Sequence, residues 1–161
     1  MTISLQRMKL YCDEMLIGLA RWLRAAGYDT KIASFMMSDR QLFDEAVEQH
    51  RILITRDRKL IEFREAATTV VLLGCNTLET CIEELSGRLH IDWLKKPFSR
   101  CLACNTPLIA AGLEQYEKLP ASVKKSVKDI MYCSQCDQLF WEGSHVNRMR
   151  KRLNDFNRQY G

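Results

Sequence analysis

The chain has 161 residues, of which 47% are hydrophobic and 27% charged, a composition typical of a globular domain rather than of a disordered or fibrous chain. No apolar run approaches the ~18 residues that a membrane span requires, and residues 1–7 lack the apolar core of a signal peptide, so we expect no membrane association and a cytoplasmic location. The net charge of +4 is uneven: residues 1–93 carry 12 basic and 14 acidic residues, whereas residues 94–161 carry 12 basic and 6 acidic. The second part therefore suits a polyanion, although a merely solubilising surface explains the charge equally well.

Residues 1–93 alternate between strand patterns and helix patterns. The strand patterns are short runs of aliphatic residues, and such alternation favours an α/β fold, with a mostly parallel sheet flanked by helices. The crossovers between parallel strands should be right-handed. We predict strands over residues 8–12, 29–33, 51–55 and 70–73.

Capping residues and glycines indicate where the helices begin and end. Gly27 should end a helix over residues 14–26. Ser38 and Gln41 form a capping-box pattern that opens a second helix. Two further helices are predicted, one following Asp57 as far as about Ala66, and one from Asn76 with Glu79 to Gly87.

Four cysteines in two CxxC pairs are typical of a zinc site. Cys101 and Cys104 form the first pair and Cys133 and Cys136 the second, with 28 residues between them that should hold a loop or a short helix. Four thiolates complete a tetrahedral site, so the ion would be structural and would contribute directly to folding. Two redox-active pairs are the alternative. The other cysteines lie outside this spacing and are predicted to be small apolar core residues: Cys12, Cys75 and Cys81.

Two aspartates directly follow predicted strands. Asp13 follows the strand over 8–12, and Asp57 follows the strand over 51–55. Because the carboxyl ends of parallel strands share one edge, where open α/β sheets bind ligands, we expect both at that edge. Carboxylates there would suit Mg²⁺ or Mn²⁺, although each residue alone could simply cap a helix. Asp39 begins a helix, and the pattern does not place it at this edge.

Several arginines could hold phosphates beside these acids. Arg21 and Arg24 are three residues apart on a helix face away from the apolar stripe, and Arg56 and Arg58 flank Asp57. A solvated helix surface is the alternative for Arg21 and Arg24.

The last segment reads as a basic amphipathic helix with Ser144 as its N-cap. Its apolar residues recur at helical spacing and should pack inward. Its basic face would bind phosphates of a nucleic acid without base specificity. The inward residues are Met149, Leu153 and Phe156, and the basic residues are Arg148, Arg150, Lys151, Arg152 and Arg158.

Three motifs, in order along nearly the whole chain, resemble the Mut7-C family. The first is Asp-Glu-Met-Leu, Leu-Ala-Arg-Trp-Leu-Arg and Gly-Tyr-Asp-Thr within residues 13–30; the second joins Ser-Asp at 38–39 to the run at 51–58. The third combines the CxxC pairs with Trp-Glu-Gly-Ser-His at 141–145. The resemblance implies a PIN-like nuclease domain at 1–93 and a zinc ribbon with a basic C-terminal helix at 97–161.

The resemblance also implies a catalytic site. Asp13, Asp39 and Asp57 would be its acidic residues and would ligate Mg²⁺ or Mn²⁺, which supplies the placement of Asp39. PIN-type enzymes often have a fourth acid after the next strand, where this sequence has Asn76. The acidic residues that could substitute are Glu14, Asp44 and Glu45.

We therefore expect a divalent-metal-dependent endoribonuclease with a structural zinc ion and RNA as its partner. A non-catalytic RNA- or ribosome-binding protein with a degenerate nuclease site is the alternative. A third reading is an adaptor that binds proteins through the zinc ribbon alone.

Overall fold

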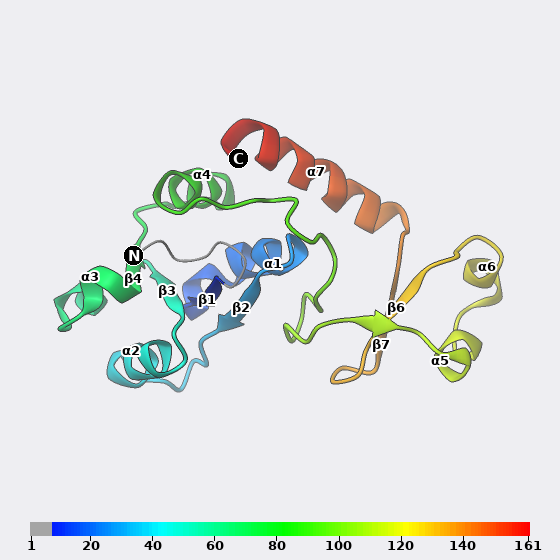
Figure 1. Cartoon of the computed structure of the whole chain (residues 1–161), viewed down its shortest axis with the longest axis horizontal. Helices are drawn as coiled ribbons and strands as arrows, with labels where there is room; N and C mark the ends of the chain where they lie inside the picture. Colours follow the sequence, from blue (N-terminus) through cyan, green and yellow to red (C-terminus); the bar gives the residue numbers. More distant parts are fainter. Residues whose placement is uncertain (1–7) are drawn as a thin grey trace.

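The computed structural model describes residues 8–161 and has two sheets, one parallel and one antiparallel (Figure 1). The first sheet has the order β2-β1-β3-β4, and every neighbouring pair is parallel. Its strands are β1 (Lys9–Cys12), β2 (Asp29–Ile32), β3 (Ile52–Thr55) and β4 (Val70–Leu72). The predicted α/β fold with a parallel sheet is thereby confirmed. The expectation about a signal peptide concerns residues 1–7, which lie outside the described residues.

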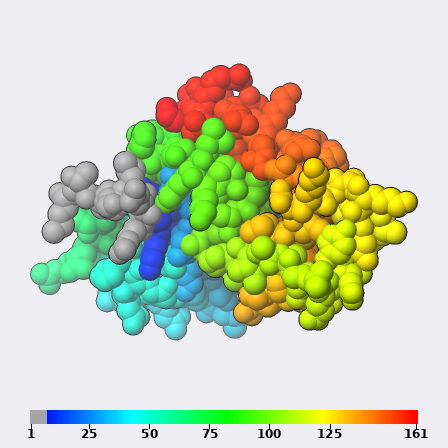
Figure 2. All heavy atoms as spheres, turned by 45° about the vertical axis from the view of Figure 1, so that its right-hand side comes forward, coloured from blue at the N-terminus to red at the C-terminus, as the bar shows by residue number. Residues whose placement is uncertain are grey.

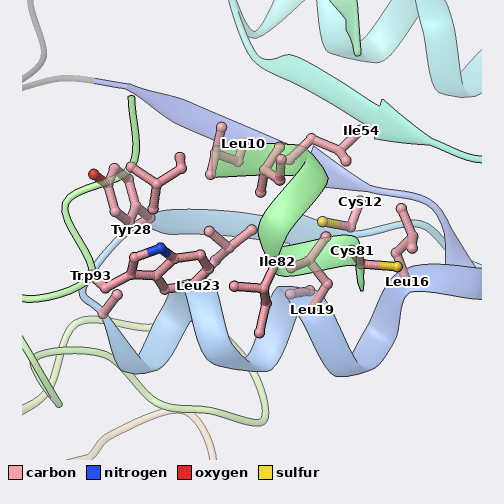
Figure 3. Close-up of a cluster of buried hydrophobic side chains, with 14 of the residues drawn as sticks. Leu10, Cys12, Leu16, Leu19, Leu23, Tyr28, Ile54, Cys81, Ile82 and Trp93 are labelled. Atoms are coloured by element: carbon pink, nitrogen blue, oxygen red, sulfur yellow. The ribbon is translucent and has the colours of Figure 1, made fainter. Parts of the chain in front are cut away.

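Helices cover both faces of the parallel sheet. Leu10 and Cys12 of β1 point into one core, whereas Tyr11 between them points into a second core on the other face. The first face carries η2 (Glu14–Leu16), α1 (Ile17–Ala25) and α4 (Leu78–Arg88), and the second carries α2 (Asp39–Glu48), η3 (Arg58–Glu62) and α3 (Ala66–Thr69). In Figure 3, Leu10 and Ile54 of the sheet meet Leu19 and Leu23 of α1 and Ile82 of α4. Burial on both faces explains why the strands read as apolar runs rather than as alternating ones.

Three helix limits differ from prediction. The helix expected after Asp57 is a 3₁₀ turn, η3, that stops at Phe63, whose extended backbone turns the ring onto Phe43, with 5.0 Å between centroids. The fourth helix is capped by Thr77 through its hydroxyl and the N–H of Thr80, not by Asn76. That helix continues through the predicted stop at Gly87.

Residues 99–142, here called the cysteine lobe, contain the antiparallel sheet. Its order is β5-β6-β7, and β6 and β7 form a hairpin. The strands are β5 (Ile109–Ala110), β6 (Ile130–Cys133) and β7 (Gln138–Trp141). The predicted insertion between the cysteine pairs is present as two short helices, α5 (Leu113–Glu117) and α6 (Ala121–Lys124).

The last helix, α7 (Ser144–Tyr160), follows the cysteine lobe but packs on the first part of the chain (Figure 1). Leu153 and Phe156 are buried, as predicted, in the core that α1 and α4 share. The Phe156 ring lies 5.3 Å from that of Trp22 and 5.4 Å from that of Trp93, both edge to face. The chain thus returns to its first core, and Figure 2 shows the lobe and α7 closely apposed to the rest. Gly143, not Ser144, precedes the helix as its cap.

The segment at the boundary between the two predicted domains, 1–93 and 97–161, is hydrogen-bonded to the end of α1. The N–H groups of Lys96 and Phe98 donate to the carbonyls of Ala26 and Ala25 at 3.0 and 2.8 Å. Gly27 makes this approach possible, since its φ is +99° and a Cβ there would lie 2.4 Å from the Lys96 carbonyl oxygen. Gly27, which was predicted to end a helix, therefore also lets the connecting segment pack closely against the end of α1.

Cys75 and Cys81 are buried, but the expectation that they are unpaired core residues is wrong. They form a disulfide that joins the loop after β4 to the second turn of α4. Cys12 is a free, fully buried thiol, and burial raises its pKa. Among the described residues, no helix is both long and apolar enough to cross a membrane.

Candidate functional site

Two CxxC turns bring four sulfur atoms together in the cysteine lobe. The Sγ atoms of Cys101, Cys104, Cys133 and Cys136 all lie within 4.8 Å of one another. Cys101 Sγ is 3.9 Å from Cys136 Sγ, and Cys104 Sγ is 3.4 Å from Cys133 Sγ. Sulfurs bound to one tetrahedral Zn²⁺ at about 2.3 Å stand roughly 3.8 Å apart. The four cysteines could therefore bind one zinc ion.

Each CxxC turn is closed by a residue in the left-handed region. Asn105 follows the first pair with φ 73°, and Asp137 follows the second with φ 52°. Asn and Asp adopt this conformation more readily than other non-glycine residues. The Asn105 N–H donates to the carbonyl of Cys101 at 2.9 Å, which closes the first turn.

Thr106 favours the thiolate form of Cys104. Burial opposes ionisation, but hydrogen bonds from the hydroxyl and backbone N–H of Thr106, together with those from Cys136 and Cys133, lower the pKa of Cys104 to about 6. The hydroxyl lies 3.2 Å from the sulfur, where it can donate to a thiolate. A thiolate is the form that ligates a metal.

Arg24 joins the first cysteine turn to the parallel sheet. Its Nη1 donates to the carbonyls of Leu102 and Ala103 at 2.9 and 2.7 Å, and its Nε donates to Thr30 at 2.8 Å. Its side chain is buried, whereas Arg21 on the same helix is exposed. The expectation that Arg24 shares an exposed face with Arg21 is therefore wrong, because the cysteine lobe covers it.

Asn105 adds a second contact between the lobe and the edge strand β2. Its amide donates to Asp29 Oδ1 at 2.8 Å and accepts from the Thr30 N–H at 3.0 Å. Burial opposes ionisation of Asp29, but hydrogen bonds from Arg51 and Asn105 prevail, so that the pKa of this carboxyl is lowered. The lobe thus satisfies backbone groups of an edge strand that would otherwise be open.

The three predicted aspartates line one pocket at the carboxyl edge of the parallel sheet. The pocket has a volume of about 60 Å³, roughly the space of two waters. It lies between the segment after β1, the loop before α2 and the segment after β3. Its acidic lining residues are Asp13, Glu14, Asp39 and Asp57.

Asp13 is held rigidly at the base of this pocket. Its Oδ2 accepts from the Thr55 hydroxyl at 2.5 Å and from the Arg56 N–H at 3.0 Å, and its Oδ1 accepts from the Met15 N–H at 3.0 Å. Asp13 and Thr55 are both buried. Each carboxylate oxygen has two acceptor sites, so Oδ2 is fully used and Oδ1 keeps one site for an ion.

Thr55 is a site residue that sequence reasoning missed. Besides donating to Asp13, its hydroxyl accepts from the N–H of Asp57 at 2.9 Å and so links the two aspartates. A buried threonine ending an apolar strand, two residues before an aspartate, is the pattern that could have indicated it.

Asp57 and Asp39 are held more loosely than Asp13. Asp57 Oδ1 accepts from the Lys59 N–H at 2.9 Å and caps η3, so the capping role foreseen for it is present too. Asp39 is the first residue of α2, which a full capping box of Ser38 and Gln41 opens as predicted. Within residues 8–161, the four cysteines are the one group of three or more His, Cys, Asp or Glu side chains close enough together to hold a metal ion as they stand.

The structure distinguishes among the candidates for a fourth acid. Glu14 lines the acidic pocket. Asp44 pairs with Arg40 at 2.9 Å on the exposed side of α2, and Glu45 binds Lys31 and the Tyr11 hydroxyl. Asn76 is exposed and accepts from Arg56 at 3.2 Å.

A basic pocket of about 380 Å³ adjoins the acidic one. Three arginines and one acid line it, Arg56, Arg58, Arg88 and Glu84, and Arg88 pairs with Glu84 at 3.0 Å. Arg56 connects the two pockets, since its side chain lines the basic one and its backbone N–H donates to Asp13 in the acidic one. Two of the arginines predicted near Asp57 thus come together with a third that the sequence did not single out.

The basic residues of α7 divide into two sets. Arg150 pairs with Glu142 and lies over the Phe98 ring, and Arg152 pairs with Glu79 and lies over Trp22. Arg148 and Lys151 are exposed. Arg150 and Arg152 therefore help to fasten the helix, and only part of the predicted basic face is open to solvent.

The family model described as the Mut7-C RNAse domain matches residues 8–153, nearly the whole chain. The matched region includes the parallel sheet, the cysteine lobe and most of α7. No curated protein and no solved structure matches the chain.

Proposed function

The chain belongs to the Mut7-C RNAse domain family, and from that premise we propose that it is a divalent-metal-dependent endoribonuclease. The observation that carries the proposal is the pocket lined by Asp13, Asp39 and Asp57 at the carboxyl edge of the sheet. These carboxylates would hold Mg²⁺ or Mn²⁺, which supplies a nucleophilic water and stabilises the developing phosphoryl charge. Asp13, fixed by Thr55, would set the position of the ion.

The adjoining basic pocket supports an RNA substrate. Arg56, Arg58 and Arg88 would neutralise the phosphates on one side of the scissile bond. Arg148 and Lys151 offer further exposed charge on α7. A structural zinc ion in the cysteine lobe would hold the fold in which these surfaces meet.

Replacing Asp57 tests this function. Asp57→Asn removes a ligand charge at the pocket, and we expect RNA cleavage to fall by at least about 100-fold. Cleavage of a labelled single-stranded RNA would be followed with Mn²⁺, with Mg²⁺ and with EDTA. Asp44→Asn is the matched control, because Asp44 is an exposed aspartate on α2 outside the pocket. If wild type and Asp57→Asn leave the same trace of cleavage, the enzyme proposal fails.

A non-catalytic RNA-binding protein is the second candidate. The position of Asn76 outside the pocket that the three aspartates line favours it. It predicts that RNA binds without metal-dependent cleavage, and that Asp57→Asn changes neither result.

We further propose Glu14 as the fourth acid of the site. Glu14→Gln should reduce cleavage about 10- to 100-fold and raise the Mn²⁺ concentration needed for half-maximal rate, since a carboxylate near the ion is lost. Glu45→Gln is the control, because Glu45 lies beside Tyr11 and Lys31, outside the pocket. Equal metal dependence of wild type and Glu14→Gln would remove Glu14 from the site.

A further inference from the structure

A turn at the rim of the acidic pocket exposes two large apolar side chains. The N–H of Met37 donates to the Ser34 carbonyl at 3.0 Å, which makes Phe35 and Met36 the central residues of the turn. Their exposed fractions are 76% and 90%. Ala33 and Met37, on either side of the two, line the pocket itself, so the turn projects from the edge of the acidic site.

Met15 adds a third exposed apolar side chain from another segment. It is 61% exposed and lines the same pocket, and its backbone N–H binds Asp13. Within residues 8–161, seven large hydrophobic side chains are exposed, and these three all belong to segments around the acidic pocket. Three of the others, Ile109, Leu113 and Tyr116, belong to the cysteine lobe. One of the two groups of exposed apolar side chains therefore lies where the proposed chemistry would occur.

The surroundings indicate what this surface would contact. The Arg56, Arg58 and Arg88 pocket adjoins the acidic site and suits a phosphate backbone. A single strand of RNA offers the faces of its unpaired bases along with its phosphates, and base faces stack on aromatic rings irrespective of sequence. A duplex hides these faces within its own stack. Apolar and basic surfaces beside one acidic pocket thus match a single strand.

We propose that Phe35, supported by Met15, stacks on an unpaired nucleobase next to the scissile phosphate, so that the substrate is single-stranded RNA. This inference rests on the proposed nuclease function. Phe35 has no side-chain donor or acceptor, so it would hold a base without selecting one. Its position at the tip of a turn lets a ring present its face without disturbing either core.

Binding of RNA that contains 2-aminopurine tests the stacking. The fluorescence of this base is quenched when it stacks, and leaving Mg²⁺ and Mn²⁺ out of the assay prevents cleavage without removing the zinc ion. Wild type should quench the probe in a single strand and bind it more tightly than in a duplex. Phe35→Ala should weaken single-strand affinity about 5- to 150-fold, the equivalent of about 1–3 kcal/mol for one stacked base, and abolish the quenching. Phe35→Trp should retain both.

Leu113→Ala is the matched control and should bind as wild type does, since Leu113 is 85% exposed but lies on α5 in the cysteine lobe. Unchanged affinity of Phe35→Ala, absent quenching by wild type, or equal affinity for duplex and single strand would each overturn the inference. So would a wild-type dimer that Phe35→Ala makes monomeric, because the turn would then be a protein interface. This experiment measures binding and not cleavage. Quenching that depends on Phe35 could therefore be observed even if the Asp57→Asn experiment showed that the protein is not a nuclease.

Discussion

Zinc removal should unfold the cysteine lobe. Wild-type protein should contain about one zinc per chain, and a strong chelator or Cys133→Ser should abolish its binding. Cys133 is fully buried at the end of β6, beside the turn of the β6–β7 hairpin, so its replacement removes a ligand from the inside of the cluster. Structural zinc contributes about 10–16 kcal/mol of apparent binding free energy in small metal-stapled modules. The lobe has few buried apolar residues of its own, so we expect it to unfold at 25 °C without the ion.

Elemental analysis and amide hydrogen exchange would measure this effect. Exchange should accelerate throughout β5, β6 and β7 and less in β1 and β3, which have a separate core. Cys12→Ser is the control, because Cys12 is a buried thiol outside the cluster and its replacement should leave the zinc content unchanged. Zinc-free protein with full protection in the β6–β7 hairpin would contradict the assignment.

Arg24→Met should destabilise the protein by about 3–5 kcal/mol, the second large effect. The change removes three hydrogen bonds from a charged, buried donor and leaves the buried Thr30 carbonyl and the partly buried Leu102 and Ala103 carbonyls without it. Burial lowers the pKa of Arg24, and the nearby cysteines oppose this. A zinc ion with four thiolates carries a net charge of about −2, which would compensate the buried guanidinium.

Urea unfolding of Arg24→Met against Arg21→Met would measure the effect. Arg21 lies one turn away on the same helix and is exposed, so its replacement should change the free energy of unfolding by no more than about 0.5 kcal/mol. Because Arg24 binds the first cysteine turn, the destabilisation caused by Arg24→Met should be smaller in zinc-free protein. Comparing wild type and Arg24→Met, each with and without zinc, would measure this non-additivity. Equal stabilities of the two variants would show that the observed bonds contribute little.

Features that depend on a few neighbouring residues were predictable. The CxxC spacing predicted the sulfur cluster, because each turn positions two sulfurs by itself. Ser38 and Gln41 predicted the start of α2 for the same reason. Asp13 and Asp57 could be placed at one sheet edge because each ends a strand of the same parallel sheet.

The errors concern choices that several neighbours could satisfy. Thr77 and Asn76 are adjacent, and only the reach of the Thr77 hydroxyl to Thr80 decides the cap. The helix predicted after Asp57 ends at Phe63, where the backbone is extended and the ring packs on Phe43 of another helix, a contact that the local sequence does not indicate. Glu14 could not be preferred over Asp44 or Glu45, since all three are acids on predicted helices and only the pocket separates them.

By itself, the sequence determined the α/β alternation, the cysteine cluster and the acidic sheet edge, because these follow from local periodicity and spacing. Only the tertiary structure decided that Arg24 is buried, since its partners Leu102 and Ala103 lie 78 and 79 residues away in the sequence. It likewise decided that Thr55 links Asp13 to Asp57, and that Phe35 stands at the pocket rim. The role of each of these side chains depends on whether a segment far away in the sequence covers it or leaves it exposed. Local patterns in a single sequence do not indicate such long-range contacts.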